Sequence, residues 1–182
     1  MTGANVKNYK LDPETKAFLE KSASVYPDDA VTRTVENNRQ CYDRLCALFP
    51  SPLPAGITRT GGLITGRNGD IPIRTYTPAA ASSTATVMYL HGGGFILGGL
   101  DSHDSICADI ADRSWIEVIA VDYRLAPENS YPAQVEDARD AFLAIDRDNT
   151  IVVGDSAGAT LAAAVCIAQR HSSQRPVGQV LI

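Results

Sequence analysis

The sequence predicts an α/β fold in which a mostly parallel sheet is covered by helices on both faces. From residue 85 onward, short apolar runs alternate with longer segments whose apolar residues recur every three or four positions. Strand and helix patterns that alternate in this way favour right-handed crossovers and parallel strand pairs, which bury both faces of a sheet. Two of the expected strands also run directly into glycine-containing turns.

Length and composition agree with a soluble enzyme that has one core and the composition of an ordinary globular domain. The chain has 182 residues, of which 45% are hydrophobic and 20% are charged. Its net charge of −5 argues against nucleic acid or an anionic membrane as the main partner. No run is long enough for a transmembrane helix and Met1–Lys7 lacks the apolar core of a signal peptide, so the expected location is the cytoplasm.

The cysteines favour buried, reduced thiols over a disulfide or a metal site. They are scattered and form no C-x-x-C pair; they are Cys41, Cys46, Cys107 and Cys166. No metal and no cofactor are expected.

Two helices are expected before the sheet. Asp12 is a suitable N-cap for the first, with Pro13 at its first helical position. The second is expected to start at Asp28-Asp29 and to stop at Pro50. Residues 1–55 would then form an N-terminal helical segment, and residues 56–182 the α/β core.

A β-hairpin is expected next. Asn68-Gly69-Asp70 is a turn signal between residues 63–65 and 71–76, which have strand character. Pro72 cannot donate a backbone hydrogen bond, so it predicts an edge position for the second strand.

The rest of the core is expected to alternate between helices and short strands. Asp101 or Ser102 should cap a helix that runs to about residue 114, and a buried strand should follow over Ile116–Val121. Pro132 then starts a helix whose apolar positions include Phe142.

The expected strand Ala85–Leu90 opens into His91-Gly92-Gly93-Gly94-Phe95. Three successive glycines free backbone N–H groups to point into a site, as one half of an oxyanion hole requires. A flexible surface loop and a phosphate-binding loop are the alternatives. A phosphate loop needs Lys-Ser or Lys-Thr after its glycines, and Phe95-Ile96-Leu97 stands there instead.

A second motif, Gly154-Asp155-Ser156-Ala157-Gly158, lies between an expected strand and a helix of small apolar residues. This G-x-S-x-G pattern is typical of a nucleophile elbow, in which glycines prevent collisions at a tight turn. The turn would present the hydroxyl of Ser156 above the carboxyl edge of the sheet, with the amide of Ala157 at a helix N-terminus where it can bind an oxyanion. Asp155 is expected to point elsewhere and brace a neighbouring loop.

These residues resemble the hormone-sensitive-lipase-like family of α/β-hydrolases, and within it the bacterial acetyl esterases. The resemblance rests on three segments, His91–Gly98, Asp122–Glu128 with Tyr131-Pro132 after it, and Gly154–Gly158. It implies the α/β-hydrolase fold and a small ester as the substrate.

The resemblance also implies roles for single residues. Ser156 would hydrolyse short-chain carboxylic esters, and the amides of Gly93, Gly94 and Ala157 would hold the oxyanion, while His91 and Gly92 shape the loop. Residues 1–55 would form a cap over the site, although packing against the sheet edge is an equal alternative. Asp122 and Glu128 are interpreted as structural.

The remaining members of a catalytic triad are missing from the expected places. In this fold an acid and then a histidine follow the serine. No Asp or Glu lies between Ser156 and Ile182, and His171 would lie about 20 Å from Ser156 along the intervening helix. His91 is expected to brace its loop, and His103 to lie in the first turn of a helix.

We therefore expect the chain to be an incomplete and inactive portion of an esterase, prone to associate through an unpaired sheet edge. The alternative is a non-catalytic protein that binds a small ligand on the same scaffold. Whether it forms a homo-oligomer is left open.

Overall fold

A computed structural model describes residues 10–27, 29, 34–81, 84–145 and 147–182. The chain divides into two compact units, residues 1–49 and residues 50–182. The prediction made for Met1–Lys7 lies outside the described residues.

The first unit contains two capped helices. Helix α1 (Pro13–Ala23) begins as predicted, since the Asp12 carboxylate accepts a hydrogen bond of 2.9 Å from the Thr15 amide. Helix α2 (Val35–Ala47) is capped by Thr34. The predicted start at Asp28-Asp29 is wrong for this helix because a hydroxyl at position 34 supplies the cap. Asp28 itself and residues 30–33, which follow Asp29, lie outside the described residues.

A small aromatic contact joins the two helices. The rings of Phe18 and Phe49 lie 5.0 Å apart, and the Lys21 ammonium donates to the Leu48 carbonyl at 2.6 Å. No residue of α1 is buried. This unit therefore has little core of its own within the described residues.

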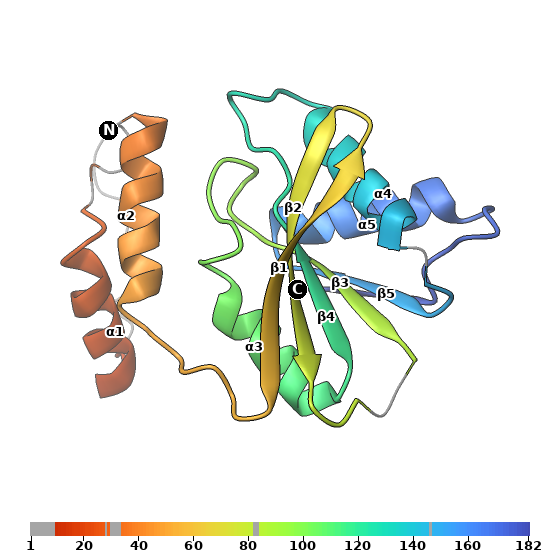
Figure 1. The fold of residues 1–182 in the computed structure, drawn as a ribbon. Coiled ribbons are helices and arrows are strands. Elements are labelled where there is room, and N and C mark those ends of the chain that lie inside the picture. The colour runs from red at the N-terminus through yellow and green to blue at the C-terminus, as the bar shows by residue number, and fades with distance from the viewer. Residues whose placement is uncertain (1–9, 28, 30–33, 82–83, 146) are drawn as a thin grey trace. The chain divides into compact units, whose positions relative to one another are not determined.

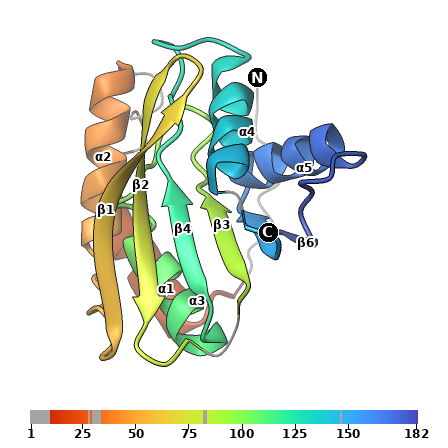
Figure 2. The ribbon, with the colours of Figure 1, turned by 45° about the vertical axis from the view of Figure 1, so that its right-hand side comes forward.

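In the second unit the described strands form one sheet, in the order β1-β2-β4-β3-β5-β6. Figure 1 labels β1 to β5, and Figure 2 labels β6. The pairs β1–β2 and β2–β4 are antiparallel, whereas β4–β3, β3–β5 and β5–β6 are parallel. The predicted mostly parallel sheet is confirmed. The strand bounds are β1 (Ile57–Gly66), β2 (Gly69–Pro78), β3 (Thr86–Leu90), β4 (Glu117–Val121), β5 (Thr150–Gly154) and β6 (Gly178–Leu181).

Helices cover both faces of the sheet, as predicted (Figure 2). Helix α3 (Asp104–Ser114) packs on one face, and α4 (Ala133–Ile145) and α5 (Ala157–Gln169) pack on the other. Alternate residues of β3 divide between the two cores, since Met88 and Leu90 join the α4 and α5 side while Val87 and Tyr89 join the α3 side. None of the described helices combines the length and apolar character needed to cross a membrane.

The edge position predicted from Pro72 is wrong, because β2 lies between β1 and β4. The carbonyl of Pro72 accepts from the Asp122 amide at 2.9 Å, just beyond the last paired residue of β4. The nitrogen of the same residue faces the same side of the strand, so the proline cannot return a bond to Asp122. An interior strand tolerates this proline because it stands at the end of the β2–β4 ladder, which runs from Ile73 onward.

The predicted cap of α3 is also wrong. The N-cap position is His103, whose side chain makes no capping bond. The Ser102 hydroxyl is instead bound to the backbone of Gly99 at 3.0 Å, and Asp101 pairs with Arg74 at 2.8 Å. Both expected capping side chains have partners elsewhere, so the helix starts later.

Candidate active site

Ser156 lies at the turn between β5 and α5. Its φ of 51° and ψ of −114° place it in a backbone region that non-glycine residues rarely adopt. It occupies the N-cap position of α5, but its side chain makes no capping bond. The residue is exposed, and its hydroxyl makes no hydrogen bond to another described residue. The turn therefore leaves an unengaged hydroxyl at the carboxyl edge of the sheet.

Close approach of backbones explains the two outer glycines of this turn. A β-carbon on Gly158 would collide with the carbonyl oxygens of Leu90 and His91, and one on Gly154 would collide with the backbone of Gly158. The turn is also tied to the end of the sheet, since the Ser156 amide donates to the Ile182 carbonyl at 2.8 Å. The sequence pattern predicted this turn because the close backbone contacts at Gly154 and Gly158 leave no room for a β-carbon.

The glycine loop after β3 lies beside this turn. β3 and β5 are parallel neighbours, with Leu90 opposite Gly154, so the residues that follow both strands leave the same edge together. The loop is curled by positive φ angles at Gly93 (118°) and Gly94 (63°). The Gly93 carbonyl accepts from the amides of Ile96 and Leu97 at 3.1 and 2.8 Å, which closes the curl.

Among the backbone N–H groups of the two motifs, those of Gly93, Gly94 and Ala157 have no acceptor among the described residues. The amide of Ala157 is the first of α5, where helix geometry leaves donors unpaired. The Gly92 amide, in contrast, donates to the Asp155 carboxylate at 2.9 Å. Gly92 thus anchors the loop while the next two amides remain available for a ligand.

Asp155 links the turn to the loop. Its Oδ1 accepts hydrogen bonds from the Tyr89 hydroxyl at 2.8 Å and from the Gly92 amide, and lies 3.5 Å from Nε2 of His103. Burial would raise the pKa of Asp155, but these donors outweigh it and the pKa is lowered. Asp155 is therefore an ionised brace, in agreement with the expectation from the sequence.

His91 is buried within the loop and does not carry charge at neutral pH. Its Nδ1 lies 2.7 Å from the Gly92 carbonyl, so this nitrogen holds the hydrogen, and its ring stacks on Tyr123 with centroids 4.3 Å apart. Burial lowers the pKa of His91 to about 4. The Tyr123 hydroxyl donates to the His91 carbonyl at 2.7 Å. These contacts agree with a role in shaping the loop.

The sequence analysis missed the part that Tyr89 and His103 play beside Asp155. Tyr89 could have been found, because it pairs with Val153 and so lies on the same side of neighbouring strands as Asp155, two residues on. His103 has no such signal. It reaches Asp155 only because the loop after β3 folds back before α3.

No described imidazole hydrogen-bonds to the hydroxyl of Ser156. His91 is engaged with Gly92, His103 with Ser102 and Asp155, and His171 with Arg170 at the exposed end of α5. The described residues also contain no cluster of three or more histidine, cysteine or acidic side chains able to hold a metal ion. A base for Ser156 is therefore absent from this part of the chain.

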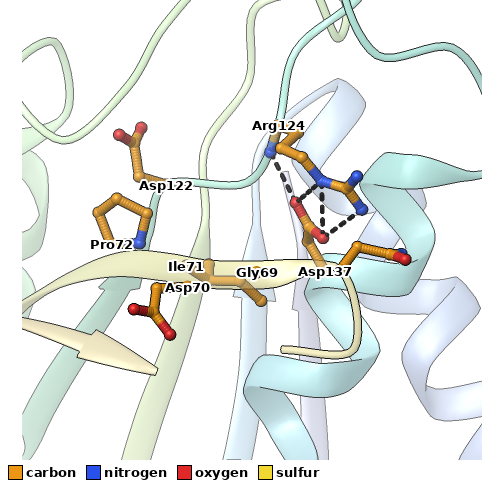
Figure 3. A pocket seen from close by; sticks show the side chains of 8 residues that line it. Gly69, Asp70, Ile71, Pro72, Asp122, Arg124 and Asp137 are labelled. Carbon is orange, nitrogen blue, oxygen red and sulfur yellow. Dashed lines mark hydrogen bonds and ion pairs between the residues drawn. The ribbon is translucent and has the colours of Figure 1, made fainter. Parts of the chain in front are cut away.

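A small pocket lies at the hairpin (Figure 3), and no residue of the glycine loop or of the Ser156 turn lines it. Its volume is about 40 Å³, room for water rather than for an acyl chain. Arg124 and Asp137 close one side through bonds of 2.7 to 3.1 Å. Asp122 lies opposite, half-buried, and burial raises its pKa. Glu128 is exposed.

Comparison with protein families identifies the fold. A family model described as an alpha/beta hydrolase fold matches residues 87–182. The carboxylic ester hydrolase LipN of Mycobacterium tuberculosis is 36% identical over 175 residues, which cover 90% of this chain and 46% of that protein. An ethyl acetate hydrolase of Pseudomonas putida is 40% identical over 184 residues, 91% of this chain and 57% of that protein. The chain thus spans about half the length of these relatives.

Solved structures of similar proteins have the same fold. An ester-hydrolase from the metagenome of Lake Arreo, solved with a bipyridine phosphonate derivative, superposes with a TM-score of 0.83 at 33% identity. The match covers 94% of this chain and 59% of that structure.

Proposed function

Because the chain belongs to the α/β-hydrolase fold family, we propose that it carries the nucleophile and the oxyanion donors of a carboxylic ester hydrolase acting on short-chain esters such as acetates. The observation that carries this proposal is the set of unpaired amides at Gly93, Gly94 and Ala157 beside an unengaged serine hydroxyl. The names of the relatives, an ester hydrolase and an ethyl acetate hydrolase, support the same reaction class.

In the proposed mechanism the Ser156 oxygen attacks the ester carbonyl carbon while a base removes its proton. The carbonyl oxygen becomes an oxyanion, and the amides of Gly93, Gly94 and Ala157 donate to it. Fixed donors of this kind stabilise the developing charge more than the neutral ester, which lowers the barrier. Collapse expels the alcohol, which takes up the proton, and water then hydrolyses the acyl-serine and restores the hydroxyl.

The base and its acid partner are proposed to come from outside these 182 residues. Within the described part of the chain, each histidine has other partners, and the curated relatives are about twice as long. A serine without a base remains protonated and is a weak nucleophile. Two expectations remain predictions: that residues 1–55 form a helical cap over the site, and that the protein is cytoplasmic.

Hydrolysis of nitrophenyl acetate tests the proposal. The 182-residue chain should turn over this ester no faster than its Ser156→Ala variant, while a longer form that supplies an acid and a histidine should show turnover that the same substitution abolishes. Turnover by the 182 residues that depends on Ser156 would contradict the statement that they lack a base. A longer form without serine-dependent turnover would contradict the proposed reaction.

Binding without catalysis is a second candidate, favoured by the missing base alone. It would use the same donors to hold a small carboxylate. Tight binding of such a ligand by a longer form that is inert toward esters would favour it over the hydrolase.

A further inference from the structure

His103 lies in a continuous set of polar contacts that encloses the glycine loop. At one end of the loop the Gly92 amide donates to Asp155 at 2.9 Å. At the other end the Gly99 amide donates to the Ser102 hydroxyl at 3.0 Å. His103 joins the two anchors, since its Nδ1 lies 2.8 Å from the Ser102 oxygen and its Nε2 lies 3.5 Å from Oδ1 of Asp155.

The location of His103 restricts its freedom. Its side chain is only 6% exposed, and its ring centroid lies 5.4 Å from that of His91 and 6.2 Å from that of Tyr89. A buried polar side chain held on both nitrogens transmits the position of one partner to the other. The connection therefore differs from a solvated surface ion pair.

The direction of the hydrogen bonds follows from the partners. A neutral imidazole with its hydrogen on Nδ1 would point the lone pair of Nε2 at the Asp155 carboxylate, which is repulsive. With the hydrogen on Nε2, the ring donates to Asp155 and accepts the Ser102 proton at Nδ1. When the ring is protonated, Nδ1 donates to Ser102, whose own proton then goes to the Gly99 carbonyl, 3.0 Å away. In both arrangements His103 donates to Asp155.

The two proposed donors of the loop, Gly93 and Gly94, lie between these anchors. The bonds to the Gly93 carbonyl fix the curl of the loop itself, but neither donor N–H is bound to another described group. The placement of the curled loop beside the amide of Ala157 therefore depends on how Gly92 and Gly99 are held. A displacement of about 1 Å in such a site reduces the rate by about 100-fold. Any residue that fixes both anchors at once thus controls the geometry of the donors.

We propose that His103 is a positioning residue that holds both ends of the loop Gly92–Gly99 against the Ser156 turn, through Asp155 and Ser102. This inference rests on the proposed function for its catalytic consequence, but not for its structural part. His103 acts through its neighbours and is not assigned contact with the substrate.

Hydrogen exchange resolved by NMR tests the structural part on the 182-residue chain, without any need for activity. In His103→Leu the amides of Gly92 and Gly99 should exchange at least 10-fold faster than in the wild type, while those of Ile119 and Ala120 in β4 keep their rates. His103→Gln, whose terminal amide can still donate to Asp155, should restore the Gly92 rate to within about threefold. His171→Leu, at an exposed histidine, is the matched control and should change neither loop amide.

Kinetics test the catalytic part in whichever length of the protein shows turnover that Ser156→Ala abolishes. His103→Leu should lower kcat by about 10- to 100-fold with KM changed less than twofold, because the donors act on the transition state. His103→Gln should recover most of kcat. Unchanged loop exchange in a folded His103→Leu protein overturns the proposal, and so does faster exchange with unchanged kcat. If no form hydrolyses esters, the proposed function fails, while the exchange rates still decide whether His103 holds the loop.

Discussion

Removing the carboxylate of Asp155 should destabilise the core far more than a typical surface substitution. Asp155→Ala deprives three donors of their acceptor, the Tyr89 hydroxyl, the Gly92 amide and the imidazole of His103. A buried donor without a partner costs about 1–3 kcal/mol. Because the carboxylate side chain is 28% exposed, water can satisfy part of this set. We expect a loss of about 3–5 kcal/mol in the free energy of unfolding.

Urea denaturation followed by circular dichroism measures this loss, and a double-mutant cycle isolates its cause. Tyr89→Phe alone should cost about 1 kcal/mol, because Asp155 keeps its other donors. Beside Asp155→Ala the same change should regain about 1 kcal/mol, since it removes a buried hydroxyl that has lost Asp155 as its acceptor. The coupling energy would then be about 2 kcal/mol in magnitude. Additive effects, or an Asp155→Ala protein within 1 kcal/mol of the wild type, would refute the reasoning.

Two further predictions concern the same motifs. Burial lowers the pKa of His91 in the folded state to about 4, from 6.5, so the folded state resists protonation of this side chain. Its contribution to stability is therefore complete above pH 6.5 and is lost as the pH falls from 6.5 to 4. The urea midpoint should fall less over this range in His91→Asn than in the wild type, and an equal fall would point to other groups. Gly158→Ala should abolish folding, because the new β-carbon would collide with two backbone carbonyls. Gly94→Ala places its β-carbon in open space and should cost only about 1–2 kcal/mol for its positive φ. Soluble yield and thermal melting compare the two variants, and equal stabilities would contradict the contact argument.

The motifs and strands could be predicted because they depend on local patterns. The β-branched run before Gly154 and the three glycines after Leu90 each carry their own signal, and the structure has strands ending at both points. The alternation of strand and helix also predicted a mostly parallel sheet, including the parallel pair β3–β4.

The predictions that failed concerned residues whose structure depends on partners distant in the sequence or on the local path of a loop. Pro72 was placed at an edge because the end of the β2–β4 ladder could not be known from the sequence, and this ladder ends at Ile73, next to the proline. Ser102 was expected to cap a helix, but Gly99 competes for its hydroxyl. The approach of His103 to Asp155 joins residues 52 positions apart through a curled loop, which no periodicity reveals.

The backbone at position 156 also limits which nucleophiles this corner could ever carry. At a φ of 51° a branched β-carbon would crowd the adjoining peptide groups, so threonine, despite having a similar hydroxyl, does not fit. Cysteine and aspartate carry a single γ atom on an unbranched β-carbon and do fit. Chemical variation on this scaffold is thus confined to side chains that leave the β-carbon unbranched, whatever bond they attack.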